Sequence, residues 1–253
     1  MRNKINNVRF FSKHRSGFTL IELSIVLIII GLIVSGVFVG KHLIEAAENR
    51  AIIHDIEQFK NAFYTFYSKY DHIPGDIPNA TSFFSGCVDD GGNLCNGDGD
   101  KLIEYGNYEA IRVWQHLSLA GMVKGSYTGL IADLPTIGLT SPLAGLGGGF
   151  YSFYYHPTTM YGVSDSDFRL GSIFDNAWAI DSLVTAQRAW NIDKKMDDGE
   201  ASTGYVHTLR GWSIWNTGGT CVTGTYAAAA GASDYILTDS DKSCSMYFKF
   251  DIE

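Results

Sequence analysis

Residues 16–22 read Ser-Gly-Phe-Thr-Leu-Ile-Glu, and they open the segment that decides the fold of this chain. From Leu23 to Gly40 no side chain is ionisable. As an α-helix with a rise of ~1.5 Å per residue, residues 18–40 would be roughly 34 Å long, which is enough to cross a hydrocarbon core of ~30 Å. The sequence therefore predicts one membrane-spanning helix close to the N-terminus.

Glu22 is the one ionisable side chain within residues 18–40. A carboxylate inside a membrane-spanning segment is costly, so such a residue marks a candidate functional site. Because Glu22 lies near one end of the segment, the alternative is an interfacial position at the lipid headgroups. The sequence alone leaves both interpretations open.

The first 17 residues carry five positive charges and no acid: Arg2, Lys4, Arg9, Lys13 and Arg15. Positive charges beside a spanning helix predict that this leader stays in the cytoplasm and that the C-terminal part is translocated. A secretory signal peptide is cut after its apolar region, at a site of small residues. Here a Gly-Phe junction precedes the apolar region, which is not the order of a secretory signal.

A basic leader, Gly17, Phe18, Glu22 and an uncharged run in this order resemble the processing site of type IV prepilins and type II secretion pseudopilins. In that family a membrane peptidase cuts after the glycine, and the new N-terminal residue is N-methylated. The resemblance implies processing between Gly17 and Phe18 and an assembly role for Glu22. It also implies three partners: the prepilin peptidase/N-methyltransferase, other pilin or pseudopilin subunits, and the inner membrane.

The helix is expected to continue beyond Lys41 with a different character. Large apolar residues recur every three or four positions, which predicts one buried seam; they are Ile52, Ile56, Phe59, Phe63, Phe66 and Tyr70. Pro74 lacks a backbone N–H and disfavours helical geometry in the preceding residue, so the helix should end near His72. The predicted divisions are a leader (1–17), a transmembrane and assembly half (18–40), an amphipathic half (41–73) and a globular head (74–253).

The head contains signals for both helices and strands. Residues 108–124 and 185–196 are predicted helices, the second with Thr185 as its N-cap. Strands are predicted at 150–155, 172–180, 205–215 and 246–252. The expected fold class is α+β and pilin-like: a long N-terminal helix packed on an antiparallel sheet, with short extra helices.

Charge and cysteine content restrict the function of the 253-residue chain. Removing the five positive charges of the leader takes the formal net charge from −8 to −13, which argues against nonspecific nucleic-acid binding. All four cysteines lie in the part predicted to be translocated, where disulfides persist. Three connectivities are open, and we expect the two local pairs, Cys87–Cys95 and Cys221–Cys244.

Two acidic clusters are candidate metal sites. Asn96, Asp98 and Asp100 place oxygen ligands at alternate positions, as in the first half of a calcium loop. Lys101 stands where such a loop has glycine, so the match is incomplete; some pseudopilins bind calcium in their heads. The second cluster is Asp193, Asp197 and Asp198, and its favoured interpretation is a helix end that leads into a turn.

Catalysis is not expected of this chain. It has no Gly-x-Ser-x-Gly nucleophile elbow and no zinc-type spacing of cysteine and histidine. The predicted function is a structural subunit, minor or specialised, of a type IV pilus or a type II secretion pseudopilus. The alternative is a membrane-anchored, adhesin-like binding protein that does not polymerise. The predicted location is the bacterial inner membrane, with a single pass and a periplasmic head, followed by the pilus or pseudopilus.

Overall fold

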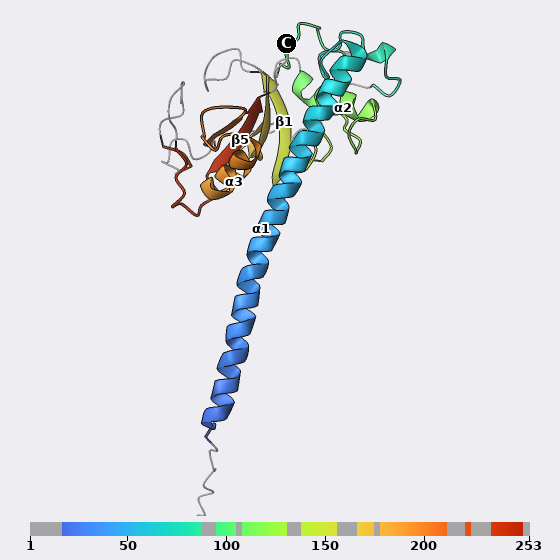
Figure 1. The fold of residues 1–253 in the computed structure, drawn as a ribbon. Coiled ribbons are helices and arrows are strands. Elements are labelled where there is room, and N and C mark those ends of the chain that lie inside the picture. Colours follow the sequence, from blue (N-terminus) through green and yellow to red (C-terminus); the bar gives the residue numbers. More distant parts are fainter. Residues whose placement is uncertain are drawn as a thin grey trace, which may run out of the picture. The chain divides into compact units, whose positions relative to one another are not determined.

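The computed structural model describes residues 17–87, 95–104, 108–130, 138–155, 166–174, 178–211, 221–223 and 234–249 (Figure 1). The chain divides into two compact units, a first unit Met1–Ala46 and a second unit Ala47–Glu253. Residues 1–16 of the predicted leader lie outside the described residues.

One helix, α1 (Leu20–Tyr70), contributes to both units. It ends slightly before the predicted His72. The backbone N–H of Asp71 still donates to the carbonyl of Tyr67 (2.8 Å), but Asp71 itself adopts a left-handed conformation with φ of 57°. Aspartate tolerates that conformation, which terminates a helix. The turn that Pro74 predicts therefore begins with the residue after Tyr70.

In the first unit, α1 exposes apolar side chains all round. Residues such as Leu20, Leu27, Leu32 and Val37 are each more than 65% exposed. One window of 18 residues has a mean hydropathy of 2.8 and no buried residue. By length and composition this part of α1 can cross a membrane, as the sequence predicts.

In the second unit, α1 buries the predicted seam. The buried residues from this part of the helix are Asn49, Ile52, Ile56, Phe59, Ala62, Phe63 and Phe66. The ring of Phe59 packs against that of Tyr151 at 5.1 Å between centroids, and the ring of Phe63 stacks on that of Phe153 at 5.4 Å. Burying each large side chain contributes about 1.5–3 kcal/mol relative to leaving it exposed. This half of the helix is thus a wall of the core.

The sheet of the second unit is antiparallel throughout (Figure 1). Its strands are β1 (Gly149–Tyr155), β2 (Ser166–Phe174), β3 (Trp178–Asp181), β4 (Val206–Arg210) and β5 (Cys244–Lys249). The order is β1-β2-β5-β4, and β3 also pairs with β2. The last strand, β5, therefore lies between β2 and β4. The α+β, pilin-like fold class is confirmed.

The single strand predicted at 172–180 is wrong. It is replaced by the end of β2 and by β3, which pair antiparallel with Ser172 opposite Asp181. The chain therefore reverses direction between Phe174 and Trp178, where the sequence contains Asp175 and Asn176, two residue types that favour turns. Close pairing depends on Gly171, because a Cβ atom there would lie 2.3 Å from the carbonyl oxygen of Ala179. Propensity identified the strand residues here and missed the reversal.

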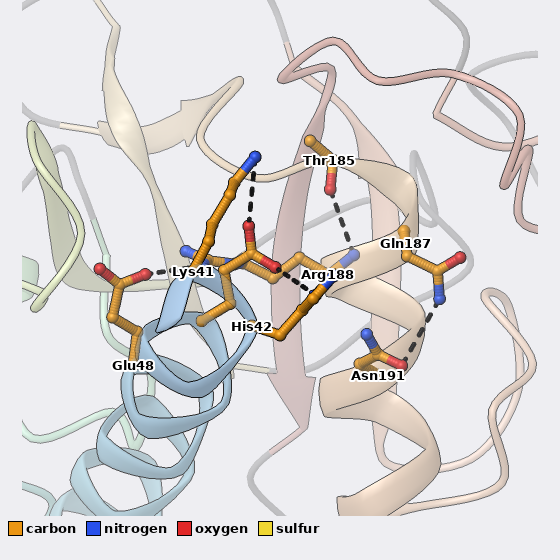
Figure 2. Close-up of polar contacts among 8 residues, drawn as sticks. Lys41, His42, Glu48, Thr185, Gln187, Arg188 and Asn191 are labelled. Atoms are coloured by element: carbon orange, nitrogen blue, oxygen red, sulfur yellow. Dashed lines mark hydrogen bonds and ion pairs between the residues drawn. The ribbon is translucent and has the colours of Figure 1, made fainter. Parts of the chain in front are cut away.

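The two predicted head helices are present. Helix α2 (Glu109–Leu119) is shorter than the predicted 108–124, since the chain leaves the helix before Gly121, whose φ is +70°. Helix α3 (Ala186–Met196) begins as predicted: Thr185 is its N-cap, and the Thr185 hydroxyl oxygen accepts from the backbone N–H of Arg188 at 3.2 Å (Figure 2). A short 3-10 helix, η1 (Ala80–Ser82), follows the turn after α1.

An ion pair joins α3 to the second-unit part of α1. The guanidinium of Arg188 donates from Nη2 to Glu48 Oε2 at 2.6 Å (Figure 2). In the first unit, Lys41 and His42 lie within 3.8 Å and 3.7 Å of the carboxylate of Glu45 on their own helix. Glu48 is thus used for tertiary packing, whereas Glu45 interacts within one helix.

Candidate functional site

The Gly17–Phe18 junction is open to solvent. Both residues precede the first residue of α1 and lie in no regular element. The side chain of Phe18 is 83% exposed, and among the described residues other than its chain neighbour no group lies within 4 Å of the position that a Cβ of Gly17 would take. A processing enzyme can therefore reach this peptide bond without unfolding any part of the chain that the structure describes.

Thr19 and Glu22 form a reciprocal cap at the start of α1. The backbone N–H and the hydroxyl of Thr19 both donate to Glu22 Oε2 at 2.8 Å, and the backbone N–H of Glu22 donates to the Thr19 hydroxyl oxygen at 3.3 Å. This is the capping box that Ser/Thr followed three residues later by Glu predicts. The role of Thr19 was missed at the sequence level, although the spacing of the two residues carries the signal.

The cap leaves Glu22 with a second carboxylate oxygen. In the described residues Oε2 accepts both bonds from Thr19, and Oε1 accepts none. A carboxylate oxygen can accept further bonds from a cationic donor. The structure therefore holds Glu22 in a fixed place at the helix start with one oxygen available to another molecule.

All four cysteines form disulfides in the structure. Cys87 is bonded to Cys95, with the Cα atoms 5.6 Å apart, and Cys221 is bonded to Cys244, with the Cα atoms 5.2 Å apart. The second bond attaches the first residue of β5 to the described segment 221–223. Both bonds lie in the second unit.

His116, on α2, fastens the first disulfide to the turn that follows α1. The backbone N–H of Gly75 donates to Nδ1 at 2.8 Å, so Nδ1 carries no proton and Nε2–H donates to the carbonyl of Cys95 at 2.9 Å. Burial lowers the pKa of His116 to about 4. The neutral imidazole is therefore a structural crosslink, and both of its nitrogens are already engaged.

The first acidic cluster contains a residue that lies far from the others in sequence. Single carboxylate oxygens of Asp76, Asp98 and Asp100 lie within 4.8 Å of one another. The Oδ1 of Asn96, the third predicted ligand, accepts from the backbone N–H of Thr81 at 3.2 Å. Asp76 follows the Pro74 turn, and no local spacing could have linked it to Asp98. Three hard oxygen donors suit Ca²⁺, with water completing its usual six to eight ligands.

Two buried carboxylates hold this loop through its backbone. Asp76 accepts from the N–H groups of Gly99 (2.6 Å) and Lys101 (2.8 Å). Glu109, at the start of α2, accepts from those of Asp98 (3.1 Å) and Glu104 (3.0 Å). Burial raises the pKa of Asp76, and burial together with the nearby Asp76 and Asp98 raises that of Glu109 to about 7. The cluster therefore concentrates negative charge that a proton or a cation would relieve.

The carboxylates of the second acidic cluster accept hydrogen bonds from other groups of the chain. Asp197 accepts from the backbone N–H groups of Tyr205 and Val206, and Asp198 accepts from the hydroxyl of Thr203 at 2.6 Å. Asp193 accepts from the hydroxyl of Tyr235 at 2.7 Å, and burial raises its pKa to about 6. These contacts fix the segment after α3, which agrees with the expected helix end and turn.

The comparisons with known proteins bear on the N-terminal segment. Residues 12–38 match the family model described as the prokaryotic N-terminal methylation motif. No curated protein and no solved structure matches the chain. The matched residues include the Gly17–Phe18 junction and Glu22. This chain therefore carries the N-terminal methylation motif of type IV prepilin-like proteins on an α+β, pilin-like fold.

Proposed function

We propose that this protein is a structural subunit, minor or specialised, of a type IV pilus or a type II secretion pseudopilus. The observation that carries the proposal is the methylation motif at residues 12–38, which includes the Gly17–Phe18 junction and the first part of α1, where the apolar side chains are exposed. A continuous exposed apolar surface of this size indicates a site of contact with lipid or with another protein. Lipid covers it before assembly, and the helices of neighbouring subunits cover it afterwards.

Processing is the first step of this function. The prepilin peptidase/N-methyltransferase cleaves between Gly17 and Phe18 and methylates the new amine of Phe18. Mass spectrometry of the mature N-terminus is expected to find N-methylated Phe18, and Gly17→Leu should leave unprocessed precursor in the membrane. A mature protein that retains the leader, or that is cut beyond Gly40, contradicts the proposal.

Glu22 serves assembly in this proposal. Cleavage places a cationic amine on Phe18, and the carboxylate of Glu22 in a neighbouring subunit neutralises it in a filament core that excludes water. The unbonded Oε1 of Glu22 is the acceptor that the capping box leaves for that amine. A subunit in the wrong register would leave both charges alone, so Glu22 acts as a register check.

The test compares Glu22→Ala with Leu23→Ala, a change of similar size at the next position. Both variants should insert in the membrane and be cleaved. Only Glu22→Ala should be absent from filaments that are released by shear. Normal amounts of Glu22→Ala protein in that fraction would overturn the role and would favour the membrane-anchored protein that does not polymerise.

The proposed location follows from the same features. The basic leader keeps the N-terminus cytoplasmic, and α1 anchors the protein in the inner membrane by a single pass. The second unit lies in the periplasm, where its two disulfides are stable. Protease added to spheroplasts should digest the second unit and spare a membrane-embedded N-terminal fragment.

We also propose that the carboxylate cluster binds calcium through Asp76, Asp98 and Asp100. At 100 times its dissociation constant, calcium would add about 2.7 kcal/mol to the stability of the folded state. Calcium should therefore raise the melting temperature of the wild type. Asp98→Asn together with Asp100→Asn should abolish the shift, whereas the control Asp239→Asn should keep it. Equal melting temperatures with calcium and with a chelator would refute the site.

A further inference from the structure

Most charged side chains of α1 in the second unit are engaged within the chain. Glu48 pairs with Arg188, and Asp55 accepts from the hydroxyl of Tyr151 at 3.1 Å. The ammonium groups of two lysines lie over aromatic rings: Lys60 over Tyr205 at 4.1 Å and Lys69 over Tyr70 at 5.0 Å. These contacts direct four charges of the helix toward its own fold.

Arg50 and Glu57 are the exceptions. Both are exposed, and within the described part of the chain neither makes a hydrogen bond, an ion pair or a ring contact. Glu57 has a cation three residues further along its helix, but that cation is Lys60, which lies over Tyr205. An opposite pair of charges on one helix, both without a partner, is therefore presented to solvent.

The two charges lie on one face of α1, which we call the polar stripe: Arg50, His54, Glu57, Asn61 and Thr65. Spacings of three and four residues keep these side chains in one row on a helix. Four of them, all except Arg50, line a groove of about 450 Å³, together with Gln58, Ala62 and Met122. Ala62 and Met122 are the apolar residues of this lining, and the other five are polar.

We propose that the polar stripe is a contact surface for a second copy of this chain, in which Arg50 of one copy pairs with Glu57 of the next. The two helices lie parallel and are staggered by seven residues, which is about 10.5 Å along the axis. The proposal rests on the proposed function, because it describes how subunits contact one another outside the apolar half of the helix, and it requires that several copies of this chain follow one another in the filament.

The stripe complements itself only when the copies are offset. Without a stagger, parallel helices would place Arg50 beside Arg50 and Glu57 beside Glu57, and like charges repel. With the stagger, each copy uses its Arg50 toward one neighbour and its Glu57 toward the other. Such a head-to-tail contact does not close, and contacts of this type generate open helical filaments. Antiparallel helices would also pair the charges, but they would produce a closed dimer.

Charge reversal tests the pairing. Arg50→Glu and Glu57→Arg should each lower the yield of shear-released filaments, by about five-fold per contact at the upper end for an exposed ion pair. The double variant Arg50→Glu/Glu57→Arg should restore the yield, because the pair is re-formed with its charges exchanged. Lys69→Glu, on the same helix, is the matched control and should have no effect. A double variant as defective as the single variants overturns the proposal.

Crosslinking tests the geometry. In a chain that carries both Arg50→Cys and Glu57→Cys, mild oxidation of assembled filaments should join each copy to two neighbours and give a ladder of covalent multimers. Each single cysteine variant should give no ladder. Dimers alone would overturn the staggered arrangement in favour of the antiparallel one. If the wild type forms filaments and the double cysteine variant gives no crosslink, the contact is refuted. If the wild type forms no filaments, the proposed function itself is refuted.

Discussion

The two halves of α1 differ in both composition and surroundings. In the first unit, side chains such as Leu32 and Val37 are about 70% exposed on every side of the helix. In the second unit, Ile56, Phe63 and Phe66 are at most 1% exposed and lie on one side. The comparison teaches that the amount and the period of apolar side chains together decide what covers a helix. A one-sided seam among polar residues can be buried by a single sheet, whereas a helix that is apolar all round cannot.

The largest expected effect comes from removing a core side chain in the second-unit half of α1. Phe63→Ala should lower the free energy of unfolding of the second unit by about 3–5 kcal/mol, because it leaves a cavity beside Phe153. Leu32→Ala is the control in the exposed half. The first tryptophan of the chain is Trp114, so tryptophan fluorescence in detergent reports on the second unit alone. Equal melting temperatures for the two variants would contradict the division.

The disulfides sharpen the comparison, because both of them lie in the second unit. In the chain-entropy model, removing Cys221–Cys244, with a sequence separation of 23, should cost about 3.4 kcal/mol. Removing Cys87–Cys95, with a separation of 8, should cost about 2.5 kcal/mol. Chemical denaturation of the two double Cys→Ser variants measures both values. A larger loss for the short loop would show that the bonds act mainly through the native state, for instance through the contact of Cys95 with His116.

Buried titratable groups also distinguish the second unit. The pKa of His116 is lowered to about 4, so its contribution to stability is complete above its unfolded pKa of about 6.5 and is lost as the pH falls toward 4. The pKa of Glu109 is raised to about 7, so its contribution is complete below about pH 4.5 and is lost as the pH rises through 7. The two groups therefore oppose each other between pH 4.5 and 6.5.

Single variants should separate these two slopes. Relative to wild type, His116→Gln should become less destabilising as the pH falls, by up to about 1.4 kcal/mol per pH unit. Glu109→Gln should become less destabilising as the pH rises. Urea unfolding at a series of pH values gives, for each variant, the difference in unfolding free energy from the wild type. The change of this difference with pH tests the prediction, and its absolute size does not. Parallel curves for wild type and both variants would contradict the assignment.

The smallest effect concerns the ion pair at the start of the second unit. The Arg188 and Glu48 side chains are 19% and 37% exposed, so a double-mutant cycle with alanine at both positions should give a coupling of at most about 1 kcal/mol. The pair Lys41–Glu45, in the first unit, is more exposed and should not alter the unfolding of the second unit. A coupling above about 2 kcal/mol for Glu48–Arg188 would contradict the expectation that solvent screens this partly exposed pair.

The elements that rest on local pattern were predictable. The seam from Ile52 to Phe66, the end of α1 before Pro74 and the Thr185 cap all follow from periodicity or from the chemistry of one residue. The reversal between β2 and β3 was missed, although Asp175 and Asn176, which favour turns, stand between the two strands in the sequence. Propensity describes the residues of a strand and does not describe its partner.

The candidate sites show the same limit. The Thr19–Glu22 cap follows from a spacing of three residues and was available from the sequence. By contrast, Asp76 and Glu109 come to the Asp98 loop from the turn after α1 and from the first turn of α2. Only the tertiary fold brings them together, and it adds Asp76 to the acidic group that contains Asp98 and Asp100. A carboxylate that accepts hydrogen bonds from a loop distant in the sequence produces no local sequence pattern.

The position of β5 has a consequence for the life of the newly made protein. Synthesis proceeds from the N-terminus, so α1 is made first, and the strand that joins β2 to β4 is made last. Until Cys244–Lys249 has been made, β4 has no partner among the strands that the structure describes, and the Cys221–Cys244 disulfide cannot close. An unfinished chain therefore stays open to proteases until β5 completes the sheet.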